Sequence, residues 1–214
     1  MKVLNLYAGI GGNRKLWTDV DVTAVELNSD IAKIYQDFFP DDKVIVADAH
    51  EYLLQHYKEF DFIWSSPPCP THSRMNYAYN WNAKKKNISE YAKTYRYPDM
   101  NLYQEIILLY KMFKGKFVVE NVIPYYDFLI RPSVIIGRHA YWSSFYIRPA
   151  KFSNNGGIAG QTKVEPRHIY FDLDKYDLDR YNKRLALRNC VIPELGLHIF
   201  NSMNNQELSQ GKLF

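Results

Sequence analysis

The sequence predicts an α/β fold in which helices cover both faces of a largely parallel sheet. Short apolar runs alternate with helix-like stretches through the first half of the chain, which is the rhythm of repeated βαβ units. The composition agrees, because 214 residues with 47% hydrophobic and 23% charged side chains are ordinary for a globular protein. No run of about 18 apolar residues occurs, so we expect no transmembrane helix.

Each element of the first half is an apolar run or a helix-like stretch bounded by a turn. We expect strands at 2–6, 22–25, 44–46 and 60–64. We expect helices from the first glycine turn to Trp17, at 30–38 and at 49–57. Asn28 or Ser29 can cap the second of these helices, and Pro40 stops it.

The second half contains fewer and less regular elements. We expect a helix at 102–113, a strand at 116–119, later strands at 134–136 and 141–147, and a last helix at 193–200. Residues 172–184 alternate acidic and basic side chains and are expected to be exposed. Between the halves, residues 71–99 show no clear periodicity, and a loop of that length is uncommon unless it is functional or disordered.

Charge is unevenly placed along the chain. Residues 1–70 carry 6 Lys/Arg and 11 Asp/Glu, whereas residues 71–101 carry 6 Lys/Arg and 2 Asp/Glu. The basic loop 71–101 also interleaves its cations with tyrosines, which suits phosphates and stacked bases of a nucleic acid. The alternative is a solvated polar loop. The candidate nucleic-acid contacts are Ser73, Arg74, Lys84, Lys85, Lys86, Lys93 and Arg96.

Two cysteines, Cys69 and Cys190, are too few and too far apart for a disulfide framework or a zinc cluster. The histidines have no metal-ligand spacing, so we expect no metal site. The short apolar N-terminal run is not a secretory signal, and a reducing, cytoplasmic setting is expected. We expect Cys190, among apolar neighbours, to be a packing residue.

Polar groups follow three successive predicted strands. The glycine-rich segment 7–12 comes directly after the first strand and can bring a ligand close to the backbone. Glu26 ends the second strand and can accept both hydroxyls of a ribose, and Asp48 follows the third. Ligands of open α/β sheets collect at this edge of the sheet. The alternative is that the two carboxylates are helix caps or surface acids.

Cys69 follows the fourth strand, with prolines on both sides that hold its backbone extended. A thiol at the same edge as the cofactor groups is a candidate nucleophile, although a lone cysteine is more often a packing residue. Glu120 comes at the end of the fifth strand. A carboxylic acid that faces the thiol can hold and protonate a heterocyclic base; a helix-capping role is the alternative.

Together these segments resemble DNA (cytosine-5) methyltransferases. The matching motifs are Tyr7-Ala8-Gly9-Ile10-Gly11-Gly12, Glu26-Leu27-Asn28, Pro67-Pro68-Cys69-Pro70 with Ser73, Glu120-Asn121-Val122 and Arg188-Asn189-Cys190-Val191-Ile192-Pro193. The resemblance covers about residues 3–145 and 185–200, and the pairing of Pro-Cys with Glu-Asn-Val is its most specific part. It implies a Rossmann-like core and an enzyme that uses S-adenosylmethionine as its cofactor.

The resemblance also assigns roles to residues. Cys69 would add to carbon 6 of a cytosine flipped out of the helix, and Glu120 would hold ring nitrogen 3. Carbon 5 would then take the methyl group, and loss of its proton would release Cys69. Glu26 would hold the ribose of the cofactor, Asp48 its adenine amino group and Asn189 its methionine end. The implied cofactor-binding residues are Tyr7, Ala8, Gly9, Gly11, Gly12, Glu26, Leu27, Asp48, Ala49, Pro67, Asn189 and Val191.

Two departures from the family pattern stand out. The usual Gln-x-Arg-x-Arg segment is missing, and Arg138 is our candidate for its arginine, with His139 as a second choice and segment 161–167 as a competing match. The target-recognition region, normally large, is reduced to 148–184. We therefore divide the chain into a catalytic domain, 1–147 and 185–214, and this small recognition segment.

The expected function is methylation of carbon 5 of cytosine in DNA, as in a phage or a restriction–modification system with a cognate endonuclease. The first alternative is cytosine-5 methylation of RNA such as tRNA, since relatives that act on tRNA share these motifs. The second is a nucleic-acid-binding protein that keeps the fold without turnover. The missing arginine segment favours this last alternative, and the intact Cys69, Glu120 and cofactor groups oppose it.

Overall fold

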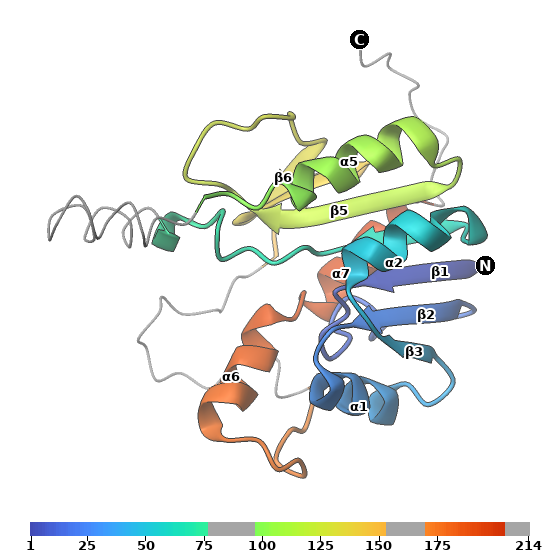
Figure 1. Cartoon of the computed structure of the whole chain (residues 1–214), viewed down its shortest axis with the longest axis vertical. Coiled ribbons are helices and arrows are strands. Elements are labelled where there is room, and N and C mark those ends of the chain that lie inside the picture. Colours follow the sequence, from blue (N-terminus) through green and yellow to red (C-terminus); the bar gives the residue numbers. More distant parts are fainter. Residues whose placement is uncertain (77–96, 153–169, 204–214) are drawn as a thin grey trace, which may run out of the picture.

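The structure, a computed structural model, describes residues 1–76, 97–152 and 170–203. Its sheet has seven strands in the order β3-β2-β1-β4-β5-β7-β6 (Figure 1). Strands β1 to β5 are parallel, and β7 runs antiparallel to both of its neighbours. The strands are β1 (Lys2–Leu6), β2 (Asp21–Glu26), β3 (Lys43–Val46), β4 (Phe62–Ser65), β5 (Lys116–Val122), β6 (Val134–Ile136) and β7 (His139–Ser143). The predicted α/β class is confirmed.

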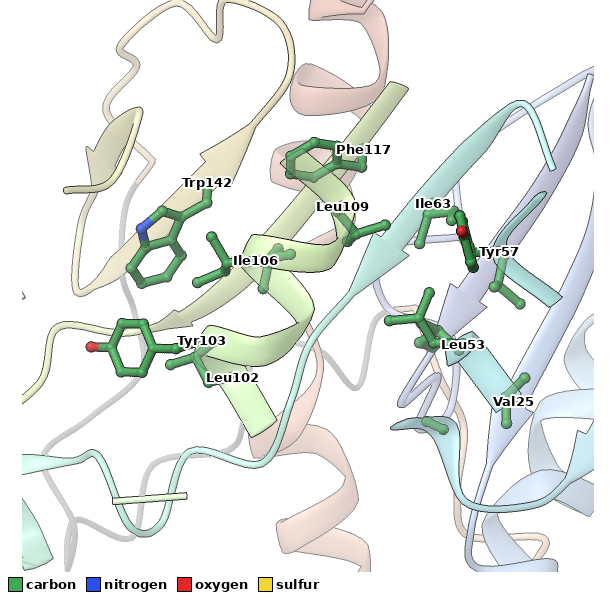
Figure 2. Close-up of a cluster of buried hydrophobic side chains, with 14 of the residues drawn as sticks. Val25, Leu53, Tyr57, Ile63, Leu102, Tyr103, Ile106, Leu109, Phe117 and Trp142 are labelled. Atoms are coloured by element: carbon green, nitrogen blue, oxygen red, sulfur yellow. The ribbon is translucent and has the colours of Figure 1, made fainter. Parts of the chain in front are cut away.

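Helices cover both faces of this sheet. They are α1 (Ser29–Phe38), α2 (Ala49–His56), the 3₁₀ turn η1 (Tyr57–Glu59), α5 (Asn101–Met112), α6 (Arg180–Asn189) and α7 (Pro193–Ser202). Helices α2 and α5 pack on one face, where Leu53, Ile106 and Leu109 meet strand residues such as Ile63 and Phe117 (Figure 2). Helices α1, α6 and α7 supply the two clusters on the other face.

The strand order predicts a ligand-binding crevice at one edge of the sheet. From β1 the chain crosses to β2 on one side, while β4 pairs with β1 on the other side. The connections that leave β1 and β4 therefore run to opposite sides, and α/β sheets bind ligands between the loops at such a point. The glycine loop 7–12 and the Cys69 segment are the two loops concerned.

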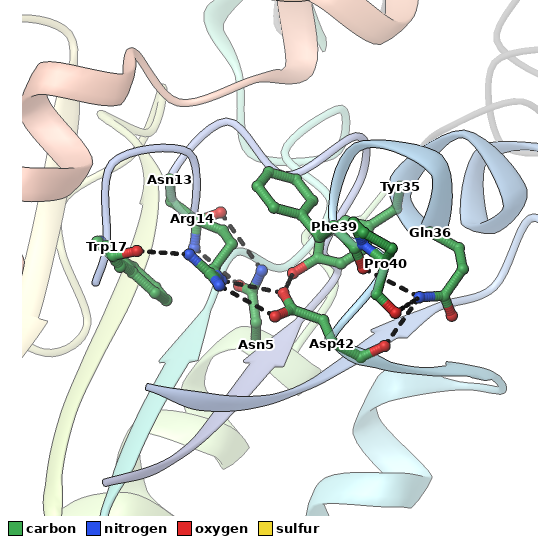
Figure 3. A network of polar contacts seen from close by, with 9 residues as sticks. All are labelled: Asn5, Asn13, Arg14, Trp17, Tyr35, Gln36, Phe39, Pro40 and Asp42. Atoms are coloured by element: carbon green, nitrogen blue, oxygen red, sulfur yellow. Dashed lines mark hydrogen bonds and ion pairs between the residues drawn. The ribbon is translucent and has the colours of Figure 1, made fainter. Parts of the chain in front are cut away.

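The predicted helix ending at Trp17 is wrong, because residues 13–17 form turns. The side chains of Asn13 and Arg14 form hydrogen bonds with residues outside this segment (Figure 3). Asn13 Nδ2 donates to Asn5 Oδ1 at 2.7 Å, and the Arg14 guanidinium pairs with Asp42 through two bonds of 3.0 Å. Tyr35 also donates to Asp42, at 2.8 Å, so this buried network holds the segment against α1 in place of a helix.

Helix α6 was not predicted, since the segment 180–189 has few apolar residues, and only Leu187 is buried. Its N-cap is Asp179, which accepts from the backbone of Asn182 at 2.9 Å. The expected exposure of 172–184 fails at Leu173, which is completely buried beside Phe171 and α1. Cys190 is buried in the same cluster, as expected of a packing residue.

Candidate active site

Cys69 lies in a loop braced against β5. The Asn121 side chain donates to the carbonyl of Pro67 at 2.9 Å, which ties the loop after β4 to the neighbouring strand. The backbone N–H groups of His72 and Ser73 both donate to the Cys69 carbonyl at 3.0 Å, so the chain turns directly after the cysteine. The Cys69 side chain is partly exposed, in contrast to Cys190.

Burial and nearby charges shift the pKa of this thiol. Burial raises the pKa of Cys69, and the negative charge of Glu120 raises it further. The charge of Arg188 acts in the opposite direction and lowers the pKa. Glu120 is thus close enough to Cys69 for its charge to act on the thiol, and Arg188 is a cation that the sequence analysis had not connected with the thiol.

The surroundings of Glu120 involve β7. Glu120 pairs with Tyr141 in the sheet, and its Oε1 lies 3.6 Å from Nε2 of His139. Because β5 continues to Val122, Glu120 sits within the strand and not at its end. Arg138 has an exposed side chain, and its carbonyl accepts from the N–H of Ile123 at 3.0 Å. The role given to Arg138 stays a prediction, and the competing segment 161–167 lies outside the described residues.

Replacing Arg188 by glutamine is expected to slow alkylation of Cys69 at neutral pH. The substitution removes the charge that lowers the pKa of the thiol, so less thiolate is present at a given pH. The measurement is the rate of reaction with iodoacetamide between pH 7 and 10, which should shift to higher pH in the variant. Arg184→Gln, on the same helix, is the matched control, and an unchanged profile in Arg188→Gln would contradict the assignment.

The glycine loop leaves open space at the expected cofactor position. Gly9 adopts φ +55°, and an added Cβ there would meet nothing within 4 Å. Its N–H donates to Glu26 Oε2 at 2.9 Å, while Oε1 of the same carboxylate accepts from Asn28 at 2.9 Å. Glu26 thus joins the ends of β1 and β2 at the mouth of the crevice. Leu27, directly after it, is largely exposed and offers an apolar surface beside the loop.

The remaining predicted cofactor residues surround the same loop or the next one. Asp48 is the N-cap of α2, because its Oδ1 accepts from the N–H of Glu51 at 2.9 Å. The alternative role as a helix cap is therefore confirmed for Oδ1 of Asp48. Gly12 packs closely on the last motif, since a Cβ there would approach the Val191 carbonyl to 2.4 Å. Asn189 ends α6 and is exposed, Ala8 and Ala49 are buried, and Pro67 is buried before Cys69.

A buried carboxylate beneath these loops was missed by the sequence reading. Glu105 of α5 is completely buried, and three side chains from other elements surround it. Tyr7 Oη and Ser65 Oγ each donate to it at 2.6 Å, and His50 Nδ1 lies 3.1 Å from its Oε1. These partners come from the end of β1, the end of β4 and the first turn of α2. The Glu105 cluster therefore fixes the strand ends that carry the glycine loop and the Cys69 loop.

The basic loop is described only in part. Ser73 lies on the turn after Cys69, and the exposed Arg74 begins the helical segment that follows. Lys84, Lys85, Lys86, Lys93 and Arg96 fall outside the described residues. Within residues 1–76, 97–152 and 170–203, no three His, Cys, Asp or Glu side chains are grouped so as to hold a metal ion. In the same ranges no helix has the length and apolar character needed to span a membrane.

Comparison with known proteins gives one family match. The family described as C-5 cytosine-specific DNA methylase matches residues 1–122. No curated protein sequence matches the chain.

Similar solved structures are distant. A DNMT2 variant of Spodoptera frugiperda is 24% identical, with 56% of this chain and 35% of that chain covered and a TM-score of 0.37. A methyltransferase of Entamoeba histolytica is 17% identical, with 57% and 38% covered and a TM-score of 0.34. A TehB-like SAM-dependent methyltransferase of Corynebacterium glutamicum is 15% identical, with 56% and 54% covered and a TM-score of 0.35.

Proposed function

We propose that this chain, which belongs to the C-5 cytosine-specific DNA methylase family, methylates carbon 5 of cytosine in DNA. S-adenosylmethionine is the methyl donor. The observation that carries the proposal is that Cys69, in the loop after β4, is close enough to Glu120 of the neighbouring strand β5 for the carboxylate charge to act on the thiol. Carbon 5 of cytosine is a poor nucleophile, and a thiol beside a carboxylic acid is the combination that can activate it.

In the proposed reaction, the Cys69 thiolate forms a bond to carbon 6 of the cytosine. The electron pair of the 5,6 double bond moves to carbon 5, and Glu120 stabilises the ring through nitrogen 3. When carbon 5 has received the methyl group, its proton leaves to a base, the 5,6 double bond reforms and the carbon–sulfur bond breaks. A cytosine stacked in a helix is out of reach of Cys69, so the base has to be flipped out.

The residues around the crevice fit the cofactor. The space over Gly9 is open, and Glu26 reaches the mouth of the crevice, where it can accept ribose hydroxyls. Leu27 presents an apolar surface suited to the adenine ring, and Asp48 can accept from its amino group. Tyr7, Gly11 and Asn189 would lie along the methionine part. When bound, S-adenosylmethionine supplies an activated methyl group on a positively charged sulfur.

The nucleic acid would lie at the carboxyl edge of the sheet, next to the basic loop 71–101. Loop 71–101 would contact the phosphates. Segment 148–184 would recognise the target sequence, and the rest of the chain would form the catalytic domain. RNA is the second candidate substrate, because this recognition segment is short. A cognate restriction endonuclease and a cytoplasmic location stay predictions that accompany the DNA substrate.

The test is methyl transfer from radiolabelled S-adenosylmethionine to duplex DNA and to tRNA, with wild type and Cys69→Ala side by side. We expect label in DNA with wild type and none with the variant, while the variant still binds the cofactor in calorimetry. Label confined to tRNA would select the RNA substrate. Label in neither substrate, with cofactor binding intact, would leave a binding protein without turnover. Cys190→Ala is the control for a thiol outside the site.

A further inference from the structure

A pocket of about 760 Å³ lies beside the proposed active site. The segment after Cys69 and the loop after β5 leave the same edge of the sheet (Figure 1), and residues of both line the pocket. The Tyr125 N–H donates to the carbonyl of His72 at 3.1 Å and joins these two segments. The pocket is lined by Arg74, Ile123, Pro124, Tyr125, Tyr126, Asp127 and Phe128.

The pocket is close to the position expected for the target cytosine. Arg74 follows Cys69 by five residues, and the chain turns between them. Ile123 follows Glu120 by three residues, which span at most about 10 Å of extended chain. Neither Cys69 nor Glu120 lines the pocket, but residues close to each of them in the sequence do, which suits a nucleotide next to the target in the same strand.

Part of the pocket wall is fixed by contacts to the core. Tyr126 Oη lies 2.5 Å from Nδ1 of the buried His72 and accepts from Tyr103 Oη at 3.3 Å. Phe128 packs edge-on against Trp142, with ring centroids 6.0 Å apart. These two rings are therefore held in place before any ligand arrives, which lowers the entropic cost of binding.

The chemistry of the lining suits a nucleobase. The ring of Tyr125 stands at 89° to that of Tyr126, with centroids 5.1 Å apart, so two aromatic planes border the pocket. Arg74 and Asp127 are both exposed and present a donor and an acceptor. A base offers a flat face for stacking and an edge with both donors and acceptors. The Asp127 carboxylate disfavours a bare phosphate, and the two charges disfavour a purely apolar ligand.

We infer that this pocket holds the base next to the target cytosine, and that the enzyme prefers single-stranded or looped nucleic acid to a full duplex. The inference rests on the proposed function and adds a substrate class to it. A base within a duplex is stacked and paired, so the pocket can receive it only after a second unpairing step. An unpaired strand avoids that cost, and unpaired bases are read by stacking and by their edges. The pocket would then supply recognition that the short segment 148–184 does not.

The test compares three oligonucleotides that share one target cytosine: a hairpin with the cytosine in its loop, the corresponding full duplex, and the hairpin with an abasic site beside the cytosine. For wild type we expect kcat/KM on the hairpin to exceed that on the other two by roughly 5- to 100-fold, the range for loss of one stacked base. Tyr125→Ala should lose a similar factor on the intact hairpin and almost nothing on the abasic hairpin. Tyr125→Phe should keep the wild-type preference.

Tyr146→Ala is the matched control, because Tyr146 is an exposed tyrosine beyond the end of β7, at the opposite edge of the sheet. Each oligonucleotide is tested as DNA and as RNA, which shows which of the two nucleic acids the enzyme prefers. Equal rates on duplex and hairpin would overturn the inference, as would an equal loss for Tyr125→Ala on the intact and abasic hairpins.

A binding readout separates this inference from the proposed function. With 2-aminopurine beside the cytosine, wild type should change the probe fluorescence on binding, and Tyr125→Ala should not. This result holds whether or not methyl transfer occurs, so failed methylation counts against the proposed function alone. A probe signal that is the same in wild type and Tyr125→Ala would overturn the pocket assignment.

Discussion

Replacing Glu120 by glutamine is expected to slow methyl transfer by roughly 10²- to 10⁴-fold while making Cys69 more reactive toward alkylating reagents. The two effects have different causes. The amide lacks the carboxyl proton that the proposed reaction uses at ring nitrogen 3, so transfer slows. The amide also lacks the negative charge that raises the pKa of Cys69, so the pKa falls and more thiolate is present at a given pH.

The measurements are single-turnover methyl transfer and the rate of iodoacetamide alkylation of Cys69 from pH 7 to 10. Glu59→Gln is the control, since Glu59 is an exposed carboxylate in η1, away from this edge of the sheet. The assignment predicts changes of opposite sign, and it fails if alkylation and methyl transfer fall together in Glu120→Gln. A merely structural role of Glu120 would produce that joint decrease or a loss of folded protein.

Replacing Glu105 by leucine is expected to lower the free energy of unfolding by about 3–5 kcal/mol, as for other broken buried networks. The leucine leaves the hydroxyls of Tyr7 and Ser65 without their acceptor in a buried site, and an unpaired buried polar group is costly. Tyr7 also has φ 55°, a strained value for a tyrosine, and its bond to Glu105 helps to hold it there. Urea denaturation monitored by circular dichroism measures this difference in the free energy of unfolding.

Tyr7→Phe is the matched control, because it removes one bond and leaves Glu105 with two partners. Its cost should be smaller, about 1.5–3 kcal/mol for a bond to a charged group. The His50 contribution depends on pH. Glu105 raises the pKa of His50, so this contribution is complete below the unfolded pKa of about 6.5 and is lost as pH rises through the raised folded value. Equal stability of Glu105→Leu and wild type would show that the cluster does not hold the strand ends together.

The parts of the site that follow strand ends could be predicted from sequence. Glu26 ends a short apolar run and Cys69 follows another after a short proline segment, and the parallel sheet brings such strand ends to one edge. Glu105 gave no comparable signal, since it lies inside an apolar helix, and its partners are 98, 40 and 55 residues away along the chain. A buried carboxylate can be recognised only when the elements that satisfy it are in place.

The same reasoning explains the other differences. The sequence analysis assigned the motif that contains Arg188 to cofactor binding. The effect of Arg188 on Cys69 depends on the packing of α6, and this helix has too few apolar residues to be predicted. Residues 13–17 have a helix-like pattern, but Asn13 and Arg14 bond to Asn5 and Asp42 and form turns instead. In both cases contacts between distant segments outweigh the local preference.

The packing of the first loop on the last helices has a consequence for the order of events during synthesis. Gly12 closes against Val191, and the Trp17 indole N–H donates to the Gly196 carbonyl at 3.3 Å, across 179 residues of chain. The strands from β1 to β7 leave the ribosome before either contact can form. A nascent chain would therefore contain the proposed nucleophile early and complete the packing around the proposed cofactor loop last.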